Sequence, residues 1–211
     1  MSRLHVITPA YRLLATLACA ALVGCIPQPA RVDASRSEAL DKSYSIELPA
    51  HWVRQYTAER NLIASRDGFV LETIAVEHRP LKKAFPQTEK AASDGMLPSE
   101  LAELEIAEIK ARDELTAALR VIENEPALLS GRDGFRLKVA YNTVRGLEIN
   151  EVVYGVIDSA AMYRVVYRAP RLYYFDRYYP EFVRTVESFT LLETKKQSRL
   201  QPAPGLRSDQ G

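Results

Sequence analysis

The sequence predicts one α+β domain, in which an antiparallel sheet of about six to seven strands is flanked by two main helices. Apolar and polar residues alternate with a period of two in several segments separated by turn residues, which is typical of half-buried strands. Two further segments repeat their apolar residues with the period of a helix, and each begins near a proline. The expected order is three strands, a helix, four strands and a second helix.

Residues that favour turns bound the strand segments. Residues 44–48 alternate until Pro49 ends the first strand. Residues 62–65 and 69–78 flank Arg66-Asp67-Gly68 and are expected to form a hairpin. Three later strands, separated by Gly146 and by Asp158-Ser159, are expected to form an antiparallel meander: 135–142, 147–157 and 162–168.

The first helix is expected to begin at Pro98, which suits a first turn. One stripe of this helix is polar only at Glu108: Leu101, Leu104, Glu108, Ala111, Leu115 and Ala118. Its many acidic residues are interpreted as a solvated face, on which Glu108 and Arg112 have the spacing of an ion pair. The second helix follows Pro170 and is expected to bury one apolar face: Phe175, Tyr179, Phe182, Val183 and Val186.

The N-terminal segment has the layout of a secretory signal peptide. Arg3 and Arg12 give it a positive flank, and an apolar run over 13–24 leads to Cys25. This run is too short to span a membrane as a helix. Cleavage at Ala18-Cys19-Ala20 would instead release a soluble periplasmic protein.

Leu22-Val23-Gly24-Cys25 resembles the lipobox of bacterial lipoproteins. The resemblance implies that Cys25 becomes the mature N-terminus and carries acyl chains, which attach the protein to a membrane facing the periplasm. Ile26 stands where lipoproteins retained in the inner membrane commonly have Asp, which favours the outer membrane over the inner one. The expected organisation is a signal peptide over 1–24, a lipidated N-terminus and flexible tether over 25–41, a domain over 42–192, and a disordered tail over 193–211.

Composition excludes several function classes. The chain has 28 basic and 27 acidic residues, which argues against a nucleic-acid binder. Removal of residues 1–24 would leave 26 basic and 27 acidic residues and an acylated Cys25, without a free thiol for redox chemistry. The standard catalytic motifs are absent, and only His51 and His78 follow the signal segment. We therefore expect no enzyme, no metal site and no cofactor.

Several motifs resemble those of PsbP-like proteins. Tyr44-Ser45-Ile46, followed by Pro49 and Trp52, is similar to the opening of such domains, although Ala50-His51 stands where many members have a glycine. Later segments match in order: Glu125-Pro126-Ala127, Gly131 to Phe135, Tyr174-Phe175, Phe182 and Ser188-Phe189. This fold also occurs in a Ran-binding nuclear-import factor and in bacterial DcrB-type lipoproteins. Over 42–192 the resemblance implies a PsbP-like sandwich used for binding and scaffolding, mostly without catalytic residues.

One aromatic cluster is a candidate binding site. Tyrosines crowd the start of the second helix, with arginines among them, and such residues are enriched at protein interfaces. The alternative is that these tyrosines pack on the sheet edge. The candidate residues, which would contact an envelope protein or glycan, are Arg171, Tyr173, Tyr174 and Tyr178.

The sequence thus favours a lipid-anchored, non-catalytic binding module in the periplasm. One alternative is a small-ligand carrier, which needs a closed cavity of at least about 300 Å³. The other is an envelope hydrolase, which needs His51 and a carboxylate within hydrogen-bond reach. Trp52 is expected to cap the core rather than to form a ligand platform.

Overall fold

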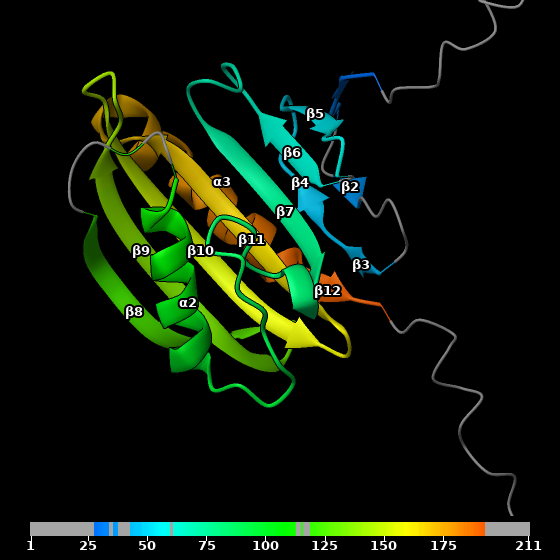
Figure 1. Cartoon of the computed structure of the whole chain (residues 1–211). Coiled ribbons are helices and arrows are strands. Elements are labelled where there is room, and N and C mark those ends of the chain that lie inside the picture. The colour runs from blue at the N-terminus through cyan, green and yellow to red at the C-terminus, as the bar shows by residue number, and fades with distance from the viewer. Residues whose placement is uncertain are drawn as a thin grey trace, which may run out of the picture.

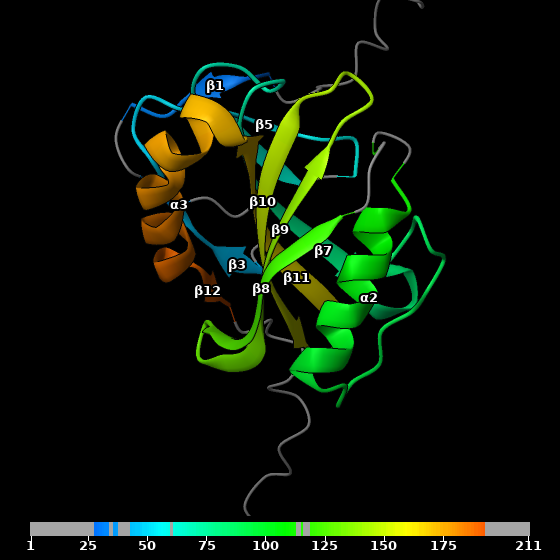
Figure 2. The same cartoon turned by 90° about the vertical axis from the view of Figure 1, so that its left-hand side faces the viewer.

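An eight-stranded antiparallel sheet with one long helix on each face forms the body of the molecule (Figures 1 and 2). The computed structural model describes residues 28–33, 36–37, 43–59, 61–112, 115 and 119–192. The predicted signal peptide over 1–24, Cys25 and the predicted tail over 193–211 lie outside these residues. Within the described part, the sheet has more strands than the six to seven predicted.

The strand order is β1-β5-β6-β7-β11-β10-β9-β8. The bounds are β1 (Ala30–Arg31), β5 (Val53–Tyr56), β6 (Leu62–Ser65), β7 (Thr73–Pro80), β8 (Arg120–Leu129), β9 (Arg132–Asn142), β10 (Glu148–Asp158) and β11 (Ala161–Pro170). Two small sheets pair β2 (Arg36–Ser37) with β4 (Glu47–Leu48), and β3 (Tyr44–Ser45) with β12 (Thr190–Leu191). The helical segments are η2 (Leu81–Lys83), α2 (Pro98–Lys110), η3 (Arg171–Phe175) and α3 (Asp176–Ser188).

The predicted meander is confirmed in β9, β10 and β11, and the predicted hairpin in β6 and β7. The first strand predicted over 44–48 is divided, because β3 pairs with β12 whereas β4 pairs with β2. Both short strands thus lie outside the main sheet. None of the described helices combines the length and the apolar composition that crossing a membrane requires.

The sheet buries both of its faces, so the molecule has two cores. Alternate residues of β11 point to opposite sides: Tyr163, Val165 and Tyr167 belong to the core under α3, whereas Met162 and Val166 pack in the core under α2. The core under α3 also contains the fully buried Trp52, which confirms its interpretation as a core residue.

The N-terminal part of the expected tether is folded. Ala30 and Arg31 pair with β5, and Val32 is buried in the core under α3. The N–H of Val32 donates to the carbonyl of Trp52 at 2.7 Å, and the N–H of His51 donates to the carbonyl of Val32 at 2.6 Å. The prediction of a flexible tether over 25–41 is therefore wrong for β1 and Val32, because one apolar side chain and a few backbone bonds attach this segment to the sheet.

The helix α2 begins at Pro98, as predicted, but ends at Lys110. The N–H of Leu97 donates to Glu100 at 2.8 Å, which satisfies one of the backbone groups at the helix start. Of the stripe predicted beyond this helix, Ala111 is exposed, Leu115 is half-buried, and Ala118 lies outside the described residues.

Candidate binding surface

Three segments meet at one end of the sheet, where β7 begins, the β9–β10 hairpin turns and β11 leads into η3 (Figures 1 and 2). The strand register places them together, since Thr73 is opposite Arg168, and Ile149 is opposite both Pro170 and Tyr141. We call this end the apical surface. It comprises the loop 66–72, the hairpin turn 143–147, residues 171–174 and Arg177.

The predicted candidate residues divide between exposed and buried positions. Arg171 and Tyr173 are exposed, and Tyr174 is partly buried. Tyr178 is only 3% exposed, so its assignment to a binding surface is wrong. Its ring packs edge-on against Trp52, with centroids 5.6 Å apart, and its hydroxyl donates to Asp67 at 2.5 Å. Burial and this hydrogen bond raise the pKa of Tyr178 to about 12.

The backbone of η3 holds two apolar side chains outward. Tyr173 has φ 71° and ψ −54°, a strained conformation for a residue with a side chain. The hydroxyl of Tyr167 donates to the carbonyls of Tyr174 and Phe175, at 2.9 and 3.0 Å, and so fixes the turn from beneath. Leu172 is 75% exposed and Tyr173 is 63% exposed. The strain thus keeps these side chains in solvent.

A cation stacks on this exposed aromatic residue. The guanidinium of Arg177 lies 4.9 Å from the ring centroid of Tyr173. The ring of Tyr174 meets that of Tyr173 edge-on, with centroids 5.1 Å apart. Arg177 and Tyr174 therefore fix the position of the Tyr173 ring without burying it.

The loop 66–72 is shaped by the buried side chain of Glu72. Its Oε1 atom accepts hydrogen bonds from the backbone N–H groups of Arg66 and Asp67, at 2.8 and 2.6 Å, and from Ser65 Oγ at 3.0 Å. Gly68 has φ 136°, which suits a residue without a side chain. These bonds fold the loop so that Val70 projects into solvent, where it is 86% exposed.

The turn 143–147 is closed by Thr143. Its carbonyl accepts from the N–H of Gly146 at 2.8 Å, and its hydroxyl accepts from the N–H of Leu147 at 3.2 Å. Gly146 has φ 76°, as its place in the turn requires. Val144 and Leu147 are consequently exposed on this turn.

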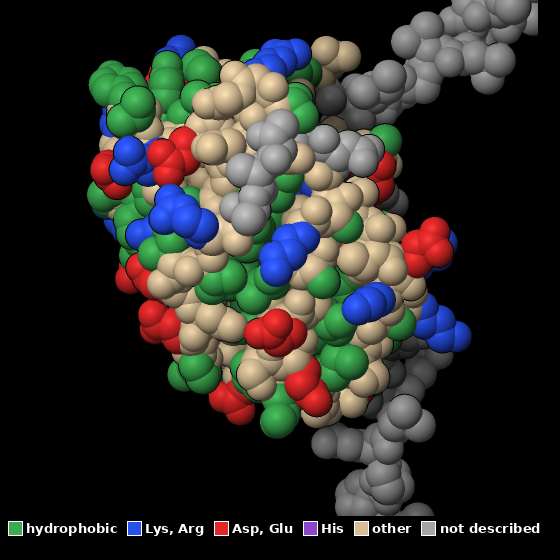
Figure 3. Space-filling view, turned by 60° about the vertical axis from the view of Figure 1, so that its left-hand side comes forward, with side chains coloured by type: hydrophobic (Ala, Val, Ile, Leu, Met, Phe, Trp, Pro, Cys, Tyr) green, Lys and Arg blue, Asp and Glu red, His purple; other side chains and the backbone are tan. Residues whose placement is uncertain are grey.

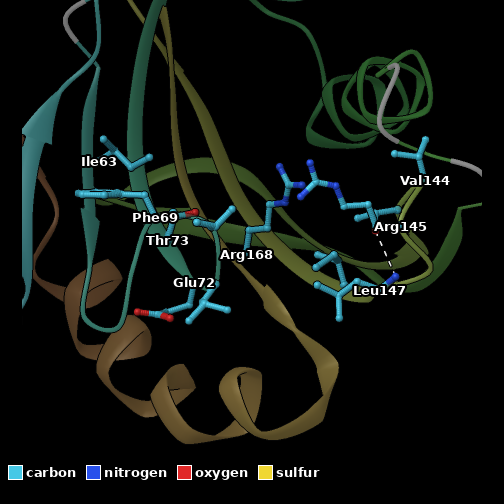
Figure 4. Close-up of a pocket in the computed structure, with 12 residues that line it drawn as sticks. Ile63, Phe69, Glu72, Thr73, Val144, Arg145, Leu147 and Arg168 are labelled. Carbon is cyan, nitrogen blue, oxygen red and sulfur yellow. Dashed lines mark hydrogen bonds between the residues drawn. The ribbon is translucent and has the colours of Figure 1, made fainter.

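A groove of about 530 Å³ separates the loop 66–72 from the turn 143–147. Its apolar lining includes Ile63, Phe69 and Ile149. Arg145 and Arg168 extend toward one another inside it, whereas the carboxylate of Glu72 points away (Figure 4). The groove therefore offers apolar walls with cationic groups between them.

Exposed apolar side chains concentrate on the apical surface. It carries five of the ten large apolar side chains that are exposed in the described part of the chain: Val70, Val144, Leu147, Leu172 and Tyr173. Figure 3 shows hydrophobic side chains gathered at the upper end of the molecule, with Lys and Arg side chains beside them. Such a concentration makes the apical surface a candidate interaction site.

Arginines give the apical surface a positive character. Glu148 accepts a hydrogen bond from Arg120 at 3.0 Å and forms an ion pair with Arg171 at 2.7 Å, so one carboxylate is shared by two guanidinium groups. Arg145 is exposed and forms no ion pair with any residue of the described ranges. The apical surface can therefore bind an anionic group.

Below the apical surface, charged pairs join α2 to the sheet. The buried side chain of Arg164 donates to Glu105 at 2.8 Å and lies 2.8 Å from Glu77. Burial raises the pKa of Glu105, and the charge of Arg164 offsets part of that effect. The predicted solvated face of this helix is therefore wrong at Glu105, which lies against the sheet.

A second pair ties the end of α2 to β10. Arg112 donates to both oxygens of Glu151, at 2.8 and 3.0 Å, and the hydroxyl of Tyr141 donates to Glu151 at 2.8 Å. Burial raises the pKa of Glu151, but the charge and hydrogen bonds of Arg112, with the nearby Arg168, outweigh it and hold this pKa below its usual value. The pair predicted between Glu108 and Arg112 does not form.

Glu108 has other partners. It is buried and accepts from the backbone N–H groups of Gln87 and Thr88, at 2.8 and 2.9 Å, and from the Thr88 hydroxyl at 3.0 Å. This carboxylate therefore fixes the segment before α2. The prediction that it faces solvent is wrong.

The two histidines that follow residue 25 lie in different surroundings, His51 in a turn before β5 and His78 on β7. His51 is exposed, with φ 68°, beside a hollow of about 350 Å³ that Glu47 and Glu181 also line. It forms no hydrogen bond with a carboxylate of the described residues, and Glu181 accepts from the indole N–H of Trp52 at 2.6 Å. The ring of His78 stacks on Tyr163, with centroids 4.6 Å apart. Over the described ranges, no group of three His, Cys, Asp or Glu side chains could hold a metal ion.

Sequence reasoning missed most of the apical surface. It did not identify Leu172, Val70, Val144, Leu147 or Arg145. A signal was available, because four of these residues lie within two positions of a turn glycine and the fifth, Leu172, lies beside the aromatic cluster. That the three segments meet could not be read from their separate positions.

Comparison with solved structures identifies the fold. No family model matches the chain, and no curated protein matches its sequence. Cyanobacterial PsbP (CyanoP) from Synechocystis sp. PCC 6803 is similar with a TM-score of 0.55 and 10% identity, over 76% of this chain and 94% of that one. The Ran-binding protein Mog1p of Saccharomyces cerevisiae is similar with a TM-score of 0.53 and 10% identity, over 76% and 97%. The chain therefore has the PsbP-like fold that the sequence motifs predicted.

Proposed function

We propose that this protein is a lipid-anchored lipoprotein of the cell envelope, which faces the periplasm and binds a partner non-catalytically through the apical surface. The lipobox Leu22-Val23-Gly24-Cys25 supports the anchor, with acyl chains on Cys25. Ile26 favours the outer membrane over the inner one. Nucleic acid is not a partner in this proposal, because the chain has no excess of basic residues.

The concentration of exposed apolar and cationic side chains on the apical surface carries the proposal. Leu172 and Tyr173 are held in solvent by a strained turn, although burying them would be favourable. Strain that is maintained at a surface indicates a binding role for the residues it presents. Mog1p, which has the same fold, is a Ran-binding protein, so this fold can support protein binding.

In-cell photocrosslinking tests this proposal. A photoreactive amino acid at position 173 should form adducts in the envelope, whereas the same probe at the exposed Leu128, on the opposite end of the sheet, should form few. The Cys25→Ser variant should lose most of its membrane attachment and most of the adducts. Equal adducts from positions 173 and 128, or full membrane attachment of Cys25→Ser, would contradict the proposal.

The groove favours a second candidate function, that of a small-ligand carrier. Its volume of about 530 Å³ suits a small molecule, and Arg145 and Arg168 could bind an anionic group on it. It is an open groove rather than the closed cavity that the sequence analysis required. Native mass spectrometry of protein extracted from the envelope would show a bound small molecule if this function is correct, and the bare mass otherwise.

A further inference from the structure

We infer that the partner of the apical surface is the phospholipid bilayer, on whose anionic headgroups the domain lies with its exposed apolar side chains inserted. This inference rests on the proposed function, because the acyl chains on Cys25 bring the domain to the membrane. It adds the orientation of the domain and the chemical class of its partner.

Little chain separates the proposed anchor at Cys25 from the folded domain. Figures 1 and 2 place β1 at the same end of the molecule as the three apical segments. The pairing of β1 with β5 and the burial of Val32 attach this strand to the sheet. Only three residue steps separate Cys25 from Gln28, and they span at most about 10 Å. An anchor this short keeps the end that carries β1 close to the bilayer.

The exposed apolar side chains of the apical surface project separately from one another. Val70, Val144 and Leu172 come from three separate segments, and each projects from its own turn. Separate projecting side chains can each enter the headgroup region, whereas a protein partner would need a surface that matches all three turns and the groove between them. Tyr173 lies beside Leu172, and tyrosine is enriched at the interface between a membrane and water.

Arginine side chains surround the exposed apolar residues of the apical surface. Arg145 has no ion pair with a described residue, and Arg120 and Arg171 share the single carboxylate of Glu148. Arg177 lies on the exposed ring of Tyr173. Guanidinium groups bind phosphate through paired hydrogen bonds, so these arginines complement anionic lipid headgroups beside the inserted side chains.

Vesicle binding tests the inference without the anchor. The chain from position 25 onward, with Cys25→Ser, contains every described residue and has no acyl group. We expect it to sediment with vesicles of phosphatidylethanolamine and phosphatidylglycerol in a 7:3 ratio, and to bind phosphatidylcholine vesicles at least about fivefold less. Binding should weaken as the salt concentration rises, because salt screens the attraction of the arginines to the headgroups.

Two pairs of variants separate the apical surface from the rest of the molecule. Leu172→Ser with Tyr173→Ser, and separately Arg145→Glu with Arg177→Glu, should each reduce vesicle binding by about fivefold or more. The matched controls change exposed residues outside the apical surface and should bind as the parent chain does: Leu97→Ser with Leu128→Ser, and Lys82→Glu with Lys83→Glu. Circular dichroism confirms that each variant is folded.

Other results would overturn the inference. These are the absence of binding to anionic vesicles, or an equal loss in apical and control variants. Adducts from position 173 that contain a protein and no lipid would also overturn it, while they would support the proposed function. An unmodified Cys25 in cells would contradict the proposed function alone, because the vesicle assay measures the apical surface without the acyl chains.

Discussion

Arg164 shows how a single buried charge stabilises this fold. It lies between the carboxylates of Glu105 and Glu77 and also donates to the carbonyl of Ala84 at 3.2 Å. Without it, Glu105 would be a buried carboxylate beside apolar side chains of the core under α2. A buried charge that loses its partner is far more costly than the loss of an exposed pair.

We expect Arg164→Met to lower the free energy of unfolding by about 3–5 kcal/mol. Urea denaturation followed by circular dichroism measures this change. Arg79→Met is the matched control, because Arg79 pairs with the same Glu77 at 3.4 Å but is partly exposed, and its loss should cost less than about 1 kcal/mol. If both variants lowered the free energy of unfolding equally, burial of the Arg164–Glu105 pair would not determine how much it stabilises the fold.

Glu151 should make the protein sensitive to acid. Its pKa is lower in the folded protein than the usual 4.5, so its contribution to stability is complete above pH 4.5 and is lost as the pH falls toward the folded pKa. The pKa of Glu105 is raised in the folded protein, so the pH dependence of its contribution is opposite. What Glu105 contributes to the free energy of unfolding decreases as the pH rises above 4.5. The two buried carboxylates can therefore be distinguished by pH.

We expect Glu151→Gln to be less stable than the parent at pH 7 and to lose less of its remaining stability below pH 4.5. The reason is that the variant has no carboxylate to protonate at this position. Urea denaturation at several pH values measures how the free energy of unfolding changes with pH in the parent and in the variant. If the free energy of unfolding fell equally with pH below 4.5 in parent and variant, protonation of Glu151 would not be the cause of the acid sensitivity.

These residues show why the acidic helix was misinterpreted from the sequence. Helical spacing compares Glu105 only with its neighbours along the chain, whereas Arg164 lies 59 positions away. In the same way, Tyr178 is buried through contacts with Trp52 and Asp67, which are distant in sequence. Partners brought together by the sheet are invisible to local patterns.

At the scale of elements, β9 and β10 pack closely at two glycines. A Cβ atom on Gly155 would lie 2.3 Å from Cε1 of Phe135, and one on Gly134 would lie 2.2 Å from the carbonyl oxygen of Gly155. The ring of Phe135 is buried in the core under α2, so it cannot move into solvent. The pairing of these strands therefore depends on the absence of side chains here.

We expect Gly155→Ala to lower the free energy of unfolding by about 1–3 kcal/mol, because the added methyl group overlaps the ring of Phe135. Gly134→Ala should lower the free energy of unfolding further, because its added methyl group overlaps the backbone carbonyl of Gly155. Thermal and urea denaturation measure both. The control is Gly155→Ala combined with Phe135→Leu, which should destabilise less than the sum of the two changes. Simple additivity would contradict the steric account.

The strands found from the sequence are those that turn residues bound, as Gly146 and Asp158-Ser159 bound β10 and Asp158-Ser159 precede β11. The strand β5 has four half-buried residues, and β8 is mostly exposed, so neither has the pattern of period two. The strand β1 has two residues in a segment with prolines. Its pairing with β5 is a tertiary contact, and local patterning could not predict it.

At the scale of the whole molecule, sequence and structure supply different parts of the account. The proposed lipobox is a local motif that needs no structure to be read, and motifs such as Tyr44-Ser45-Ile46 predicted the fold. The apical surface depends on loops from three parts of the chain meeting at the end of the sheet that also carries β1, which requires the sheet order. Only the Tyr173 region of that surface was predicted, because its aromatic residues are close together in sequence.

Hydrogen exchange of the acylated protein in isolated envelope membranes measures whether the apical surface lies on the bilayer. Relative to soluble protein with Cys25→Ser, the amides of 66–72, 143–147 and 171–175 should exchange about tenfold or more slowly in the membrane. The turn at 129–132, at the opposite end of the sheet, should be unchanged. If the turn 129–132 were protected in the membrane, or if the apical surface exchanged equally fast in both samples, the apical surface would not be the face that lies on the bilayer.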